Sequence, residues 1–259
     1  MSAFDLSGKV AIVTGANTGI GQGIALSLAQ AGADIAVVGR TVPNETQALV
    51  KGLGRRFLSI TADLSTMEPI PRILPETLEG LGRADILVNN AGMIRRADAV
   101  DFTEADWDAV MDVNLKSVFF LSQAFARHAL AEKARTGNAP THNYKIIQIA
   151  SLLSFQGGIR VPSYTAAKSG LAGVTKLMAN EWAAKGLNVN AIAPGYIVTN
   201  NTEALRADEG RARDILARIP AGRWGQPSDM GGAAVFLASS ASDYIHGAVI
   251  PVDGGWLAR

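Results

Sequence analysis

The sequence contains no cysteine, which excludes disulfide frameworks, thiolate metal sites and cysteine nucleophiles. Histidine is scarce as well: the 3 histidines are scattered along the chain, so no metal site is expected. No stretch approaches the roughly 20 consecutive apolar residues that a membrane helix needs. Residues 1–9 lack the basic start and apolar run of a secretory signal. We therefore expect a soluble, cytoplasmic protein.

An excess of charge of either sign is also missing. Lys and Arg number 24 against 23 Asp and Glu, the formal net charge is +1, and no basic run is longer than a pair. This balance argues against a nucleic-acid-binding stripe or a membrane-surface helix. Apolar residues make up 48% of the 259 residues, enough for a large core, and no linker, repeat or low-complexity tract divides the chain. One domain spanning residues 1–259 is the expected organisation.

Short apolar runs alternate with longer segments of helical periodicity. The runs are mostly continuous, as expected for parallel strands buried on both faces, and lie at residues 10–13, 35–38, 86–88, 146–149, 189–192 and 249–252. This alternation predicts an α/β fold with a single Rossmann-like, doubly wound parallel sheet and helices on both faces. The charged segment near 200–222 follows a strand end and is a candidate substrate lid, whereas the polar loop at 135–143 is a candidate surface excursion.

A glycine-rich turn follows the first predicted strand. The segment Thr14-Gly15-Ala16-Asn17-Thr18-Gly19-Ile20-Gly21 leads directly into a helical pattern. Glycines at such a turn let the backbone approach a pyrophosphate, which the helix N-terminus stabilises. The spacing Gly-x-x-x-Gly-x-Gly differs from the commoner Gly-x-Gly-x-x-Gly, so a purely structural turn stays an alternative.

Arg40 ends the second predicted strand, where an acidic residue would favour NAD and a basic one NADP. Arg40 therefore favours NADP, although it could equally be a solvated surface charge or stack on adenine. Asp63 and Leu64 follow an apolar stretch, where an adenine contact is expected, and Asn90-Ala91-Gly92 follows the strand at 86–88.

Tyr164 and Lys168 are spaced four residues apart, which places both on one helical face. A phenol has a pKa near 10, so a neighbouring ammonium that favours the phenolate would make it a usable acid or base. Ser151 follows the strand at 146–149 and could hold a substrate oxygen. A Tyr-x-x-x-Lys pair alone is weak evidence, but it gains weight beside the glycine turn.

Together these motifs, with Asn89-Asn-Ala-Gly92, Asn114 and Pro194-Gly195, resemble the classical short-chain dehydrogenases/reductases over essentially the whole chain. The resemblance implies that Tyr164 is the general acid/base, that Ser151 orients the reacting oxygen, that Lys168 holds the nicotinamide ribose and lowers the pKa of Tyr164, and that Asn114 supports a proton-relay water. The cofactor site that it implies comprises Gly15, Asn17, Thr18, Gly19, Ile20, Gly21, Arg40, Asp63, Leu64, Asn90, Ala91, Gly92, Tyr164, Lys168, Pro194, Gly195, Ile197 and Thr199. NAD and NADP both stay open, because the resemblance leans to NAD while Arg40 leans to NADP.

The resemblance implies a small sugar acid as substrate, and the residues around this site agree with one. A carboxylate needs a fixed cation, and alcohols need amides or hydroxyls. The candidate substrate residues are Arg95, Ser151, Gln156, Arg160, Asn200 and Asn201, with Arg160 the first choice for the carboxylate. Surface or inter-subunit ion pairs are the alternative role for the arginines. A 3-oxoacyl thioester reductase, another sugar or polyol dehydrogenase, and a dinucleotide-sensing regulator are the rival functions. A homotetramer is expected, since several helices carry apolar residues on more than one side.

Overall fold

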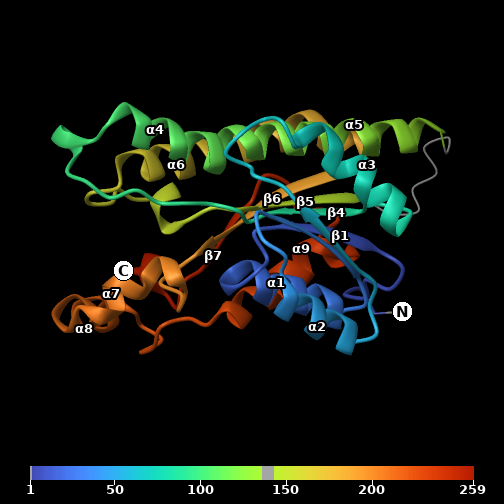
Figure 1. The fold of residues 1–259 in the computed structure, drawn as a ribbon. Helices are drawn as coiled ribbons and strands as arrows, with labels where there is room; N and C mark the ends of the chain where they lie inside the picture. The colour runs from blue at the N-terminus through green and yellow to red at the C-terminus, as the bar shows by residue number, and fades with distance from the viewer. Residues whose placement is uncertain (1, 136–142) are drawn as a thin grey trace.

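The computed structural model describes residues 2–135 and 143–259, in which seven parallel strands form one sheet (Figure 1). The strand order is β3-β2-β1-β4-β5-β6-β7, and every neighbouring pair is parallel. The strands are β1 (Val10–Thr14), β2 (Asp34–Gly39), β3 (Phe57–Thr61), β4 (Ile86–Asn89), β5 (Tyr144–Ile149), β6 (Leu187–Pro194) and β7 (Val249–Val252). The predicted doubly wound parallel sheet is confirmed.

Helices cover both faces of the sheet (Figure 1). One layer contains α1 (Gly19–Gln30), α2 (Asn44–Gly52) and α9 (Gly231–Ala238). The opposite layer contains α3 (Ile70–Leu81), α4 (Glu104–Met111), α5 (Ser117–Arg135) and α6 (Pro162–Trp182). Two separate apolar clusters fill the two interfaces, because the strands present apolar side chains on both faces.

The edge strand β3 was absent from the sequence-based prediction. Its residues are mostly half-buried, and the polar side chains Ser59 and Thr61 interrupt its apolar run. A continuous apolar run is typical of a central parallel strand covered on both sides, whereas an edge strand can carry polar residues. The search for buried runs therefore missed it.

A helical excursion leaves the sheet after β6 and returns before residue 226. Its two ends are joined by a parallel bridge between Ile197 and Gly225, with hydrogen bonds from Val198 N to Gly225 O (2.8 Å) and from Gly225 N to Tyr196 O (2.9 Å). The excursion, residues 198–224, contains α7 (Glu203–Ala207) and α8 (Glu209–Arg218), which stand apart from the helices that cover the sheet (Figure 1). It begins at the carboxyl end of a strand, where ligands bind in this architecture.

From the sequence, neither a membrane-spanning helix nor a metal site is expected. Within residues 2–135 and 143–259, no helix is long and apolar enough to span a membrane. The same residues contain no group of three or more His, Asp or Glu placed to hold a metal ion. The polar loop expected at 135–143 lies almost entirely outside the described residues.

Candidate active site

The turn between β1 and α1 has the shape that a pyrophosphate requires. Gly15 has a φ of +65°, and a Cβ there would lie 2.9 Å from the Cα of Ala91. A Cβ on Gly21 would clash with the Gly15 carbonyl oxygen. The side chain of Thr18 caps no N–H among the described residues, so the amides of the first turn of α1 can bind an anion. These residues therefore fit a dinucleotide.

Asn90 and Thr14 join this turn to the loop after β4. The Asn90 side chain donates to the carbonyl oxygens of Thr14 (2.9 Å) and Gly15 (3.0 Å). The Thr14 hydroxyl in turn accepts from the backbone N–H of Asn90 (3.0 Å) and Ala91 (2.9 Å). The structure thus brings two of the predicted cofactor segments together, and the amide of Asn90 serves to hold them.

Arg40 lies exposed at the end of β2, close enough to Asp63 for its charge to matter. The pKa of Asp63 is lowered, chiefly by hydrogen bonds from Ser65 and to a smaller extent by the Arg40 charge. The Asn17 side chain donates to the Thr41 carbonyl oxygen (2.9 Å), which fixes the turn after β2 against the glycine turn. An exposed cation at this edge fits a 2′-phosphate.

The segment after β6 reaches the glycine turn from the other side. A Cβ on Gly19 would lie 3.4 Å from the Thr199 side chain, so these two residues are neighbours. Gly195 packs so closely on β7 that a Cβ there would lie 2.6 Å from the Asp253 Cα. Of the predicted cofactor residues after β6, Thr199 therefore lies beside the N-terminus of α1, whereas Gly195 packs against Asp253.

Ser151, Tyr164 and Lys168 come together at the carboxyl end of β5. The Lys168 ammonium lies 5.6 Å from the centroid of the Tyr164 ring and donates to the Ile149 carbonyl oxygen (2.6 Å). The Ser151 hydroxyl acts on Tyr164 and lowers the pKa of its phenol against the larger effect of burial. The Ser151 side-chain oxygen accepts from the Leu153 N–H (3.2 Å), which caps a short 3₁₀ turn and fixes its position.

The two ionisable groups of this cluster are both perturbed by burial. Burial lowers the pKa of Lys168 from 10.5 to about 8. Burial also raises the pKa of Tyr164, while the Ser151 hydrogen bond and the charge of Arg96 act in the opposite direction. The Lys168 ammonium donates to the main chain of β5, and its expected effect on the pKa of Tyr164 stays a prediction.

Asn114 is fully buried in a π-helical segment, Asp112–Lys116, between α4 and α5. Its side chain accepts from the Met93 N–H (2.8 Å) and donates to the Met93 carbonyl oxygen (2.7 Å). A Cβ on Gly92 would lie 2.8 Å from the Asn114 side-chain oxygen. The Asn114 amide therefore fixes the loop after β4.

The two arginines predicted to bind substrate are engaged elsewhere. Arg95 lies 3.3 Å from the carboxylate of Asp106, and Arg160 lies 3.0 Å from that of Asp98. All four side chains are largely exposed, from 41% to 65%. Arg160 also has a φ of +65°, an unusual conformation for a residue other than glycine. The structure thus gives these arginines the surface ion pairs that were the alternative prediction.

Arg96, the next residue after Arg95, has no acidic partner among the ion pairs of the described residues. Its charge acts on Tyr164, and its guanidinium donates to the Asn201 carbonyl oxygen (3.1 Å) at the start of the excursion. Arg96 was absent from the predicted substrate residues, because the sequence does not show which of two neighbouring arginines in a loop lies nearer to the catalytic residues.

Gln156 and the two asparagines have separate surroundings. The Gln156 side chain accepts from the Trp256 indole N–H (3.3 Å). Asn200 and Asn201 form a short 3₁₀ turn with Thr202. Gln156 is therefore hydrogen-bonded to Trp256 near the C-terminus, whereas Asn200 and Asn201 lie near the start of the excursion.

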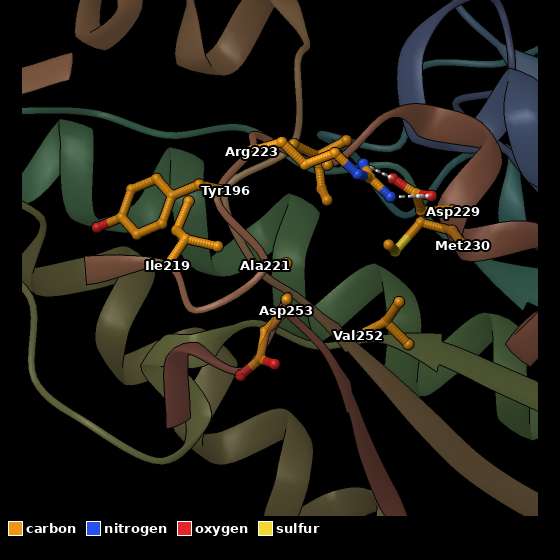
Figure 2. Close-up of a pocket in the computed structure, with 11 residues that line it drawn as sticks. Tyr196, Ile219, Ala221, Arg223, Asp229, Met230, Val252 and Asp253 are labelled. Carbon is orange, nitrogen blue, oxygen red and sulfur yellow. Dashed lines mark hydrogen bonds and ion pairs between the residues drawn. The ribbon is translucent and has the colours of Figure 1, made fainter. Parts of the chain in front are cut away.

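A pocket opens at the base of the excursion, and Figure 2 shows its lining. Tyr196 and Ile197 line it after β6, and Val252 lines it at the end of β7. Arg223 pairs with Asp229 through two bonds of 2.7 and 2.9 Å (Figure 2). Ile197, a predicted cofactor contact, lines this pocket. Two residues further along the chain, Thr199 lies next to Gly19 of the glycine turn.

An open helix N-terminus for a dinucleotide beside a Ser, Tyr and Lys cluster defines a nicotinamide-dependent oxidoreductase. The protein family described as Enoyl-(Acyl carrier protein) reductase matches residues 15–257. The chain belongs to the short-chain dehydrogenase/reductase family and is NAD(P)-dependent, as the sequence predicted. The dinucleotide-sensing alternative gains no support.

Particular relatives are similar over the full length. A 2-dehydro-3-deoxy-D-gluconate 5-dehydrogenase of Escherichia coli (strain K12) is 63% identical over 259 residues, which cover 100% of this chain and 99% of the relative. A Bacillus subtilis (strain 168) protein of the same name is 57% identical over 258 residues, 99% of this chain and 98% of the relative. A solved structure of an Agrobacterium tumefaciens protein with bound NADP is 58% identical, with a TM-score of 0.91 and 100% of both chains covered.

Proposed function

We propose that this enzyme oxidises C5 of 2-dehydro-3-deoxy-D-gluconate and reduces the corresponding ketone in the reverse direction. The observation that carries the proposal is the 63% identity, over the full chain, to the E. coli enzyme of that name. A sugar-acid substrate also agrees with the site, since the positive charge of Arg96 favours the ionised form of Tyr164.

Tyr164 is the general acid/base of the proposed reaction. In the oxidation direction its phenolate takes the proton of the substrate alcohol, and in the reduction direction the phenol returns it. Ser151, whose hydroxyl acts on Tyr164, holds the same substrate oxygen. Lys168 supplies a buried amine one helical turn away and would hold the nicotinamide ribose. Asn114 supports the site by fixing the loop after β4.

The substrate carboxylate is bound by Arg96 rather than by Arg95 or Arg160. A guanidinium offers two parallel N–H groups to a carboxylate, which both binds and orients the acid. Arg95 and Arg160 already have acidic partners, whereas Arg96 donates to a carbonyl oxygen of the excursion. Asn201 accepts from Arg96 through its main chain and Asn200 precedes it, so the side chains of these two residues would contact the sugar hydroxyls.

The nicotinamide cofactor, when bound, accepts or supplies the hydride. The residues that would hold its pyrophosphate are those of the turn from Gly15 to Gly21, and the segment from Pro194 to Thr199 would hold the nicotinamide. Arg40 would bind a 2′-phosphate, so NADP is the preferred cofactor. The excursion acts as the substrate lid, and we call it the lid below. A cytoplasmic location agrees with the absence of cysteine.

A steady-state assay tests this proposal. The purified enzyme is offered 2-dehydro-3-deoxy-D-gluconate, D-gluconate, 2-deoxy-D-gluconate and a cyclohexanol control, each with NADP and with NAD, and a 3-oxoacyl thioester with NADPH. We expect the highest kcat/KM for 2-dehydro-3-deoxy-D-gluconate with NADP. A higher kcat/KM for the thioester would overturn the substrate in favour of the acyl reductase, and a preference for NAD would remove Arg40 from the cofactor site.

A further inference from the structure

Residues 253–259, called the tail, fold back onto the lid. The Asp253 carboxylate accepts from the Gly255 N–H (2.8 Å), and both Gly254 and Gly255 have positive φ. This tight turn brings the tail to the end of α8, where the Ala221 N–H donates to the Gly254 carbonyl oxygen (2.9 Å). The tail and the lid are therefore joined through their backbones.

The lid helix α8 packs on the tail rather than on the sheet. Among the residues of α8, all of which the structure describes, Ile215 alone is buried. Ile215 lies in a small apolar cluster with Leu152, Ile219 and Trp256. Trp256 belongs to the tail and is 5% exposed, and the Arg218 guanidinium lies 4.1 Å from the centroid of its ring. A cation over an indole face adds electrostatic attraction to this packing.

Arg259 caps the carboxyl end of α8. Its guanidinium donates to the carbonyl oxygens of Ala217 (2.8 Å) and Arg218 (3.3 Å). The last carbonyl groups of a helix have no donors within the helix and carry partial negative charge, so a cation there is stabilising. The tail thus holds both a side chain and the main chain of the lid helix.

The tail also reaches the catalytic loop. The indole N–H of Trp256 donates to the Gln156 side chain (3.3 Å), and Gln156 lies in the loop between Ser151 and Tyr164. Leu152, next to Ser151, is in the same apolar cluster as Trp256. One tail side chain therefore contacts both the lid and the loop that carries the catalytic serine.

We propose that Trp256 and Arg259 are positioning residues that hold the lid closed over the substrate and so set the affinity for the sugar acid. The inference rests on the proposed function, since it assigns the lid to substrate binding. When the binding-competent lid is populated only in part, the apparent affinity falls in proportion to that fraction. The hydrogen bonds of Arg259 go to α8 and not to the glycine turn or the segment from Pro194 to Thr199, so its loss should leave cofactor affinity nearly unchanged.

Kinetics of Arg259→Ala test the proposal. If the closed lid falls to a fifth of the population, KM for the sugar acid rises about fivefold, while kcat and KM for NADP stay within about twofold. Arg259→Lys keeps a cation at the helix end and restores part of the loss. Arg72→Ala is the matched control, because Arg72 is a half-exposed arginine of α3 that also bonds a backbone carbonyl. A KM for Arg259→Ala equal to that of the control overturns the proposal.

Trypsin cleavage gives a readout that needs no substrate. The lid contains Arg206, Arg211 and Arg213, and mass spectrometry can map cleavage at each. We expect the cofactor-bound Arg259→Ala enzyme, and Trp256→Phe to a smaller degree, to be cut in the lid several times faster than the wild type and Arg72→Ala. Equal lid cleavage in the wild type and the three variants would show that the tail does not hold the lid closed. Because this assay is independent of turnover, it decides the role of the tail even if the sugar acid is wrong.

Discussion

The phenol of Tyr164 is the group on which the proposed chemistry depends. Burial favours its neutral form, and the Ser151 hydrogen bond and the Arg96 charge favour the phenolate. Tyr164→Phe removes the exchangeable proton and keeps the ring. We expect kcat to fall by roughly two to four decades, while NADPH affinity, measured by fluorescence titration, stays near the wild-type value. A variant that keeps more than about a tenth of the wild-type kcat would rule out general acid/base catalysis by Tyr164.

Arg96 and Arg95 form a natural pair of variants, since they are adjacent and equally charged. Arg96→Ala should lower kcat/KM for the sugar acid by about 10- to 100-fold, the effect of losing a charge-assisted hydrogen bond. An uncharged ketone analogue should lose much less, and Arg95→Ala should change either substrate little because its ion pair with Asp106 is exposed. Equal losses on the charged and uncharged substrates would show that Arg96 is structural.

The ion pairs of Arg95 and Arg160 could not be predicted residue by residue from the sequence. Their partners, Asp106 and Asp98, lie on the loop and helix after β4, and only the folded chain shows that they are within reach. The catalytic cluster was easier to predict, because Tyr164 and Lys168 are adjacent on a single helix.

At the scale of elements, α6 buries the amine of Lys168 at some cost to stability. Burial lowers the pKa of Lys168 from 10.5 to about 8 in the folded protein. Between pH 8 and pH 10.5 the unfolded chain therefore carries a proton on Lys168 that the folded chain has lost. Folding is therefore favoured increasingly as the pH rises from 8 to 10.5, and below pH 8 both states are protonated and the full cost is present. Lys168→Met removes this dependence.

Urea unfolding of both proteins measures this effect. The free energy of unfolding of the wild type minus that of Lys168→Met should increase from pH 8 to about 10, because other titrating groups cancel in the difference. A difference that does not change with pH would mean that Lys168 titrates normally in the folded protein.

The elements themselves could be predicted to different degrees. Central strands and the helix that carries Tyr164 follow from apolar patterning, and the structure contains them. The edge strand β3 was missed because its burial is partial. The π-helical segment around Asn114 has no sequence pattern of its own, since it depends on the contact of Asn114 with Met93.

At the scale of the whole molecule, one outer face retains exposed apolar side chains. Trp107 of α4, Phe120 of α5 and Leu177 of α6 are 40%, 41% and 49% exposed, and these helices form one layer (Figure 1). Phe125 of α5 and Leu171 of α6 are buried in the monomer and carry no information on assembly. We propose a homotetramer with this face as one interface.

Light scattering checks the assembly. We expect a particle of four 27.1 kDa chains at micromolar concentration, and a smaller one for Leu177→Asp, which places a charge on the apolar face. Glu181→Gln, on the same helix, serves as the control for a surface change. A wild-type mass of one chain would contradict the tetramer.

Hydride transfer from C5 of a sugar acid can be measured directly. The experiment uses 2-dehydro-3-deoxy-D-gluconate with deuterium at C5, oxidised by the enzyme with NADP, and mass spectrometry of the reduced cofactor. We expect one deuterium in each molecule of NADPH formed and a ketone at C5 of the product. Unlabelled NADPH, or no turnover of this acid under conditions where another substrate is oxidised, would contradict the proposed function.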